Sequence, residues 1–122
     1  MGVMFTRKEK QMVDALREMG YARRLANVLV YFSKHDNGRC KDIQSVTSLR
    51  QPEVSMALKI MMEKGWVDVR VTKGGPGAIG RPMSDYFLKR PFANIVSEIA
   101  EREVKDLERK RAVVNDLLQG VQ

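Results

Sequence analysis

The chain has few of the residues on which cofactor and catalytic chemistry most often depend. Its 122 residues include one cysteine, Cys40, and one histidine, His35. A single cysteine excludes an intramolecular disulfide and the thiolate clusters of many metal sites, and we expect Cys40 to be buried and reduced. A lone histidine beside the turn signal Asp36-Asn-Gly38 is more often structural than a ligand or a base. The sequence therefore predicts no metal site, no cofactor and no enzyme activity.

Long apolar runs are also absent. No stretch approaches the roughly 18 residues that a membrane-spanning helix needs, so we expect no membrane association. The N-terminus lacks the apolar core of a signal peptide, and the expected compartment is the cytoplasm. A hydrophobic content of 43% is nevertheless enough for one modest globular core.

Positive charge is concentrated in one part of the chain. Residues 1–91 contain 17 lysines and arginines against 9 acidic residues, which gives +8, whereas residues 92–122 contain 5 against 6, which gives −1. Attraction to phosphates is the usual reason for such asymmetry, although charge alone is equally consistent with an ordinary basic protein.

Two helices are predicted before residue 33. Thr6 and Glu9 form a capping box, and the first helix is expected over residues 6–19, where Leu16 belongs to its apolar stripe. This helix either covers the core or joins a dimer interface, and we favour the interface. The second helix has a core stripe of Leu25, Val28, Leu29 and Phe32.

Arg23 and Arg24 lie in the first turn of the second helix, where positive charge is mildly unfavourable to the helix dipole. This conflict indicates a partner such as a DNA phosphate, with solvated surface arginines as the equally plausible alternative. Residues 38–41 are expected to form a short first strand, or the remnant of one, that closes a three-stranded sheet.

Residues 41–83 predict a short helix, a turn, a second helix, a strand, a glycine-rich loop and another strand. Pro52 favours a helix start, Val54, Leu58 and Met61 form a buried stripe, and Gly65 ends the helix. Residues 66–71 alternate between apolar and polar, as in a strand with one buried face.

The loop at residues 75–80 matches the dinucleotide-binding pattern G-x-G-x-x-G. That site needs a helix directly after the glycines, but Pro82 and a stretch with strand composition follow instead. We interpret the loop as a hairpin tip at which Lys73 and Arg81 reach phosphates, with Arg81 also suited to a narrow minor groove.

One long helix is predicted from Phe92 to Leu118, with nine charged residues among the eleven of residues 101–111. At about 1.5 Å per residue it is about 40 Å long, more than a small domain can cover. The simplest way to cover its apolar stripe is an antiparallel or coiled-coil-like homodimer, and the alternative is that the helix docks on another protein. The residues assigned to the dimer interface are Leu16, Ile95, Ile99, Leu107, Val114, Leu117 and Leu118.

The order helix, turn, helix, hairpin resembles the winged helix-turn-helix transcriptional regulators, and most closely in style the MarR and TrmB groups. Residues 48–58, 63–67 and 80–82 carry the resemblance, which covers roughly residues 20–89. It implies an α+β, mainly helical fold. Residues 1–90 would form the DNA-binding winged helix with an added N-terminal helix, and residues 91–122 would form a long C-terminal dimerisation helix.

In the resembling families the second helix of the motif enters the major groove. Position by position, this predicts DNA contacts from Arg50, Gln51, Pro52, Glu53, Ser55, Met56 and Lys59. Gln51 can bridge adenine N6 and N7, and Arg50 can fork onto guanine or a phosphate. Glu53 either accepts from a cytosine amine or simply favours the helix N-terminus. Many relatives have a basic residue in place of Met56.

These features predict a sequence-specific transcriptional regulator that acts as a homodimer on double-stranded operator DNA. The alternative is a winged-helix subunit that binds other proteins in a larger complex. The sequence neither supports nor excludes a small-molecule effector.

Overall fold

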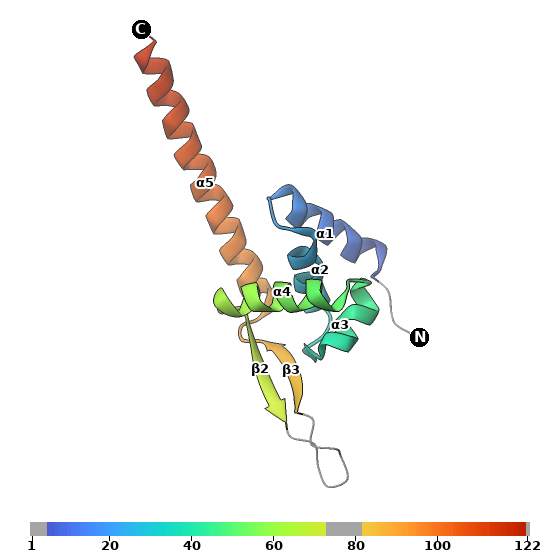
Figure 1. Ribbon diagram of the computed structural model, residues 1–122. Coiled ribbons are helices and arrows are strands. Elements are labelled where there is room, and N and C mark those ends of the chain that lie inside the picture. Colours follow the sequence, from blue (N-terminus) through green and yellow to red (C-terminus); the bar gives the residue numbers. More distant parts are fainter. Residues whose placement is uncertain (1–4, 73–81, 122) are drawn as a thin grey trace, which may run out of the picture. The chain divides into compact units, whose positions relative to one another are not determined.

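The computed structural model describes residues 5–72 and 82–121 of the chain, and its elements follow the order α1, α2, β1, α3, α4, β2, β3, α5 (Figure 1). The chain divides into two compact units, Met1–Arg90 and Pro91–Gln122. The first unit contains every element except α5, and each unit is described by itself below.

The start of α1 (Arg7–Glu18) is fixed by the predicted capping box. The Glu9 N–H donates to Thr6 Oγ1 at 3.2 Å, and the Thr6 N–H and hydroxyl donate to Glu9 Oε1 at 3.2 and 2.8 Å. These bonds satisfy backbone donors that have no partner within the helix. At the other end Gly20 has φ +97°, a conformation that glycine adopts without the clash of a Cβ atom.

The core of the first unit is built around α2 (Arg23–Tyr31), which packs against α1, α3 and α4. Its predicted stripe is buried, and so are Val30 and Tyr31 on other faces of the same helix. A helix buried on most sides belongs at the centre of a small domain. Trp66, three residues after the end of α4, is the largest fully buried side chain among the described residues.

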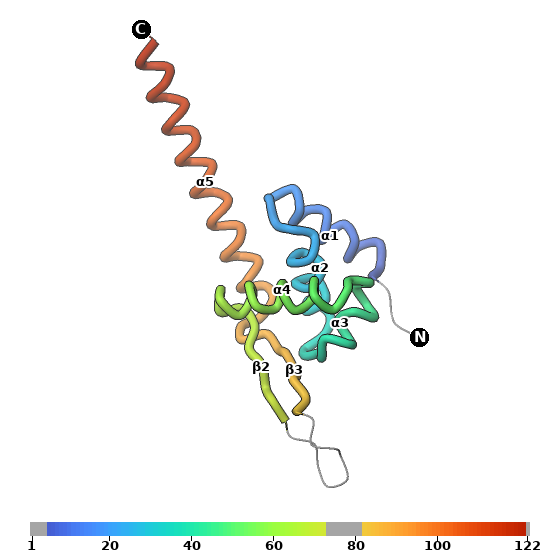
Figure 2. The backbone as a smooth tube through the Cα atoms, viewed as in Figure 1, coloured from blue at the N-terminus to red at the C-terminus, as the bar shows by residue number. Residues whose placement is uncertain are grey.

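The helix-turn-helix consists of α3 (Cys40–Thr47) and α4 (Gln51–Glu63), which the backbone trace joins by a short turn (Figure 2). Ser48 makes the turn in the left-handed conformation with φ 62°. Leu49 is buried, and its N–H donates to Thr47 Oγ1 at 3.3 Å. The turn is therefore anchored to the core on both sides of Ser48.

The sheet has three strands, as predicted, and they are antiparallel in the order β1-β3-β2. The strands β2 (Val67–Thr72) and β3 (Met83–Leu88) form the stem of the wing. The strand β1 is only Asn37–Gly38, so the prediction of a strand over residues 38–41 was wrong. The Arg39 N–H donates to Asp42 Oδ2 at 3.0 Å, and this bond starts α3 at residue 40.

Burial along β2 departs from the expected alternation. Val67 is buried and Val69 is half-buried, whereas Val71 is exposed. The strand runs out from the core toward the wing tip, so its apolar face loses cover with distance. Cys40 also differs from expectation, because it lies half-buried in the first turn of α3.

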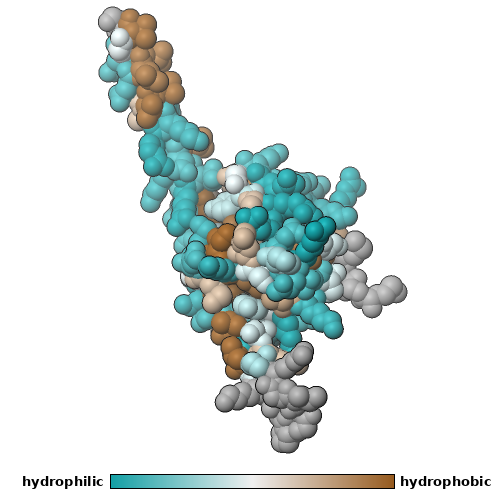
Figure 3. Space-filling view, viewed as in Figure 1, coloured by the Kyte–Doolittle hydropathy of each residue, from teal (hydrophilic) through white to brown (hydrophobic). Residues whose placement is uncertain are grey.

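The second unit is one helix, α5 (Phe92–Gly120), of 29 residues. Its charged middle section and the apolar side chains toward its C-terminal end are visible as teal and brown in Figure 3. Ile95 and Ile99 are buried, but Leu107, Val114, Leu117 and Leu118 are all exposed.

Candidate nucleic-acid interface

The helix α4 turns one face to the core and leaves the other open. Val54, Ala57, Leu58 and Met61 are buried, which is the inward face predicted from their spacing. The residues predicted to contact DNA lie between these positions: Gln51, Pro52, Met56 and Lys59 are exposed, and Glu53 and Ser55 are half-buried. Arg50, at the N-cap, is also exposed. The predicted reading residues therefore share one accessible face.

Glu53 has a specific structural role at the start of this face. Its Oε1 accepts the Arg50 N–H at 3.3 Å, and its Oε2 lies 3.5 Å from Arg23 Nη1. The carboxylate thus caps α4 and also holds an arginine from the start of α2. This geometry favours the helix-start interpretation of Glu53 over a contact with cytosine, because both carboxylate oxygens have partners in the free protein.

Gln51 and Ser55 form a second local pair, one helical turn apart. Gln51 Nε2 donates to Ser55 Oγ at 2.9 Å. An adenine edge needs the whole Gln51 amide, so binding in the bidentate mode would exchange this bond for one to the base. The bond holds the glutamine side chain along α4 and limits its rotamers before DNA arrives.

Met56 projects from the middle of this face with 51% of its surface exposed. An exposed thioether on an otherwise polar face suits contact with the methyl group of thymine. Lys59 follows at the next exposed position on α4 and adds a mobile positive charge. Ile60 and Met62 remain half-buried and exposed, respectively, near the end of the helix.

The two arginines at the start of α2 have different environments. Arg23 is exposed apart from its ion pair with Glu53, and its carbonyl accepts a hydrogen bond from Asn27 Nδ2 at 2.8 Å. Arg24 is half-buried, and its Nε is buried without a hydrogen-bond partner among the described residues. Of the two, Arg23 adjoins the open face of α4 through its ion pair with Glu53.

The wing tip lies outside the described residues, and with it the predicted contacts from Lys73 and Arg81. The stem of the wing carries a positive charge on Arg70. This side chain lies over the Phe87 ring, with 5.3 Å between the Arg70 Cζ and the ring centroid. Arg70 is exposed on β2 and is paired in register with Asp85 on β3.

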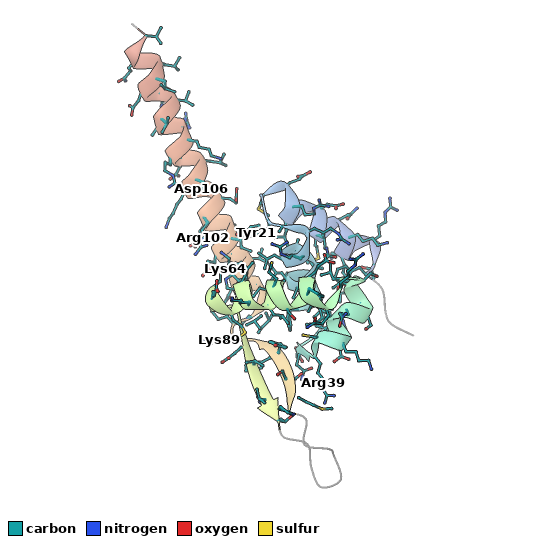
Figure 4. All side chains as sticks on the ribbon, viewed as in Figure 1. Tyr21, Arg39, Lys64, Lys89, Arg102 and Asp106 are labelled. Atoms are coloured by element: carbon teal, nitrogen blue, oxygen red, sulfur yellow. The ribbon has the colours of Figure 1, made fainter. Side chains whose placement is uncertain are left out.

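Two exposed basic residues at the start of α3 were missed by the sequence interpretation. Arg39 is the N-cap residue and Lys41 lies in the first turn. Figure 4 shows Arg39 below α3, on the same side of α4 as the β2–β3 hairpin. Positive charge in a first helical turn was the signal used for Arg23, and it would have found these residues once the helix start was known.

Two tyrosines near this region have raised pKa values. Burial, assisted by the negative charges of Asp42 and Asp85, raises the pKa of Tyr31 from 10.0 to about 12. Burial also raises the pKa of Tyr86, with a contribution from Cys40. Both phenols therefore stay protonated and neutral at physiological pH. The Tyr31 hydroxyl donates to the Asn37 carbonyl at 3.0 Å, which ties α2 to β1.

Comparison with known proteins gives a consistent result at the level of the fold. No protein-family model and no curated protein sequence matches the chain. A possible transcriptional regulator from Methanosarcina mazei Go1 superimposes with a TM-score of 0.61 at 14% identity, over 81% of each chain. A MarR family transcriptional regulator from Silicibacter pomeroyi DSS superimposes with a TM-score of 0.54 at 12% identity, over 94% of this chain and 82% of that one.

The archaeal chromatin protein TrmBL2, described as having a novel mode of DNA binding, superimposes with a TM-score of 0.55 at 20% identity. The match covers 91% of this chain but only 40% of TrmBL2. The fold is the winged helix of MarR-like and TrmB-like regulators. The predicted fold class, mainly helical α+β with a long C-terminal helix, is confirmed.

Among the described residues, no group of three or more histidine, cysteine or acidic side chains is placed to hold a metal ion. Over the same residues, no helix has both the length and the hydropathy needed to cross a membrane.

Proposed function

We propose that this winged helix is a transcriptional regulator that binds double-stranded DNA in a sequence-specific manner as a homodimer. The observation that carries the proposal is the open polar face of α4, which presents Gln51, Ser55 and Lys59 on a unit with a strong positive charge. The similarity of the fold to solved transcriptional regulators supports the same function.

Each residue of the face has a chemical role in this proposal. Gln51 reads adenine, Met56 contacts a thymine methyl, and Ser55 binds a phosphate or a base edge. Arg50 and Lys59 supply positive charge at either end of the contact. Glu53 does not read a base but keeps Arg23 at the start of α4, where the guanidinium can meet a DNA phosphate.

The dimer is proposed to form through α5. Leu107, Val114, Leu117 and Leu118 expose apolar surface that a single chain leaves in water. Leu16, Ile95 and Ile99, which were assigned to the same interface from the sequence, are buried in one chain, so they contribute less to a contact between chains. A two-fold symmetric pair would present two copies of α4 to the two halves of a palindromic site.

The test is binding to a random-sequence DNA duplex, measured by fluorescence anisotropy at several salt concentrations, with molar mass determined in parallel. We expect dissociation constants on the order of micromolar and a steep loss of affinity with salt, because phosphate contacts release counterions. Absence of binding at low salt would overturn the proposal and direct attention to a protein partner.

Two substitutions separate the roles on α4. Lys59→Ala should weaken binding to all duplexes and lower the log–log salt slope by roughly one, as expected for a lost phosphate contact. Gln51→Ala should instead reduce the preference for a selected operator over random DNA. Arg17→Ala is the matched control for Lys59→Ala, since Arg17 is also an exposed cation, in the last turn of α1. In Figure 1, α1 and the hairpin lie on opposite sides of α4.

A further inference from the structure

Several of the exposed apolar residues of α5 form one narrow stripe, whereas Val113 and Leu117, which are also exposed, lie to one side of it. Val104, Leu107, Val114 and Leu118 have between 52% and 64% of their surface exposed. At about 100° per residue, the four side chains fall within about 80° of the helix circumference. Ala100, which is also exposed, lies on the same line one heptad before Leu107. A stripe of this width is typical of a helix that packs against one other helix.

Charged residues flank this stripe in an ordered way. Along one edge Glu103 is followed two turns later by Lys110, and along the other edge Glu101 is followed by Glu108, whereas Arg111 lies within the stripe. One edge therefore changes from acidic to basic toward the C-terminus, the other edge is acidic, and Arg111 adds a positive charge within the stripe. The other cations, Arg102, Lys105 and Arg109, lie on the far side of the helix.

The far side of α5 satisfies its charges locally. Arg109 forms an ion pair with Asp106 one turn earlier. Figure 4 shows Arg102 and Asp106 projecting from the same side of the helix. Pairs within one helix stabilise it in water and leave only the residues at the stripe edges to interact with a second helix.

We propose that α5 pairs with α5 of a second copy in the antiparallel orientation, centred close to Leu107. This rests on the homodimer of the proposed function and specifies its geometry. In this register Glu103 meets the partner's Lys110 along one edge and lies level with the partner's Arg111 in the seam, whereas Glu108 approaches its own copy along the other edge. The stripe residues Ala100 and Val96 then face Val114 and Leu118 of the partner subunit.

A parallel pair in register is opposed by the same residues. Arg111 would lie opposite its own copy within the seam, and Glu103 would approach the partner's Glu108 across the edge. The contact between Glu103 and Glu108 occurs twice by symmetry and the contact between the two Arg111 residues occurs once, and each brings like charges together. The edge formed by Glu103 and Lys110 is therefore complementary to itself only when one copy is reversed.

Distances between spin labels provide a direct test. Labels are placed singly on cysteines introduced at Asn115 and Gln119, both exposed at one edge of the stripe, in full-length protein with Cys40→Ser. For a pair centred on Leu107, a rise of about 1.5 Å per residue separates the labels along the axis by about 24 Å at position 115 and about 36 Å at position 119. A parallel pair would give short and nearly equal distances at both positions.

The outcomes separate the orientation from the proposed function. Distances that lengthen by about 12 Å from position 115 to position 119 support the antiparallel pair. Short, equal distances would overturn it while leaving the homodimer intact. Absence of any inter-label distance, together with the mass of one chain, would remove the dimer itself, and DNA binding by the first unit is then still measurable by anisotropy.

A charge exchange tests the edge contacts independently. Glu103→Lys and Lys110→Glu should each raise the dissociation constant of the dimer by about tenfold, because attraction becomes repulsion at two symmetric sites. The double variant should return to within about threefold of the natural protein. In a parallel pair the double variant would give no such rescue.

Lys105→Glu is the matched control for Lys110→Glu. Both substitutions make the same change in net charge, and each breaks one opposite-charge pair four residues apart, with Glu101 and Asp106, respectively. Only Lys110 lies at the edge of the stripe. Equal weakening of the dimer by the two substitutions, measured by sedimentation equilibrium, would overturn the assignment of the edge contact.

Discussion

At the scale of single residues, the contact between Gly38 and Tyr31 explains why the shortest strand contains a glycine. Gly38 pairs in register with Tyr86, and the Tyr31 ring lies against its Cα. A Cβ atom on Gly38 would lie 2.3 Å from Tyr31 Oη and 2.9 Å from Cε1 and Cζ. Tyr31 is buried and tied to Asn37, so the ring has little freedom to move away.

Gly38→Ala is therefore expected to destabilise the protein by about 1–3 kcal/mol, through overpacking against Tyr31. Tyr31→Phe alone should cost about 1 kcal/mol for the lost hydrogen bond to Asn37. The double variant removes the shortest clash, so its cost should be smaller than the sum of the two. Urea unfolding of the three variants measures this coupling, and strict additivity would contradict the contact.

The raised pKa of Tyr31 makes a separate prediction about alkaline pH. The folded state holds this proton up to a pKa of about 12, whereas the unfolded chain releases it near 10.0. The contribution of the protonated phenol to stability is thus complete below pH 10 and is lost as the pH rises from 10 to 12. The stability of the natural protein should fall toward that of Tyr31→Phe over this range, as urea unfolding at pH 9 and pH 11 would show. A constant difference between the two proteins would contradict the burial of the phenol.

At the scale of elements, the turn between α3 and α4 depends on an unusual residue. Ser48 is the only non-glycine residue with positive φ in the described part of the chain. An L-residue in this conformation costs about 1–2 kcal/mol, and glycine avoids that cost but loses more entropy on folding.

Ser48→Gly should therefore stabilise the protein by about 0.5–1 kcal/mol, while Ser48→Val should destabilise it because a branched Cβ fits the left-handed region poorly. Thermal unfolding of both variants checks the sign. Destabilisation by glycine would mean that the Ser48 side chain contributes more to the turn than its backbone strain removes.

The elements that could be predicted from the sequence are those defined by local signals. The capping box of Thr6 and Glu9 and the glycine after α4 act within a few residues, so the sequence places these helix ends correctly. The strand β1 could not be placed, because two residues become a strand only by pairing with Tyr86 and Phe87, far along the chain.

The candidate interface shows the same difference between local signals, which the sequence reveals, and contacts between distant residues, which it does not. The spacing of Val54, Leu58 and Met61 was sufficient to identify the outward face of α4. The helix-start role of Glu53 was one of the two interpretations of the sequence, but its ion pair with Arg23 was not predictable, because Arg23 lies 30 residues away and meets it only after α2 and α4 pack together. Local patterns predict faces, and the fold decides which side chains meet across them.

At the scale of the whole molecule, the two units divide the work that the proposed function requires. The unit Met1–Arg90 contains the open face of α4 and the excess of positive charge, and α5 contains the exposed apolar stripe. A substitution in the stripe should therefore change association between chains without changing the DNA-binding surface.

Leu107→Glu tests this division, because Leu107 lies at the proposed centre of the pair and is 64% exposed in one chain. A buried carboxylate at this point should disrupt the dimer, while the thermal stability of the monomer should change little. Binding to random-sequence duplex should persist with about half the salt slope, since one copy contacts half as many phosphates. The control is Lys105→Ala, on the far side of α5, which should remain dimeric. A dimer that survives Leu107→Glu with an unchanged slope would place the interface on another element, with the exposed residues of α1 as the next to substitute.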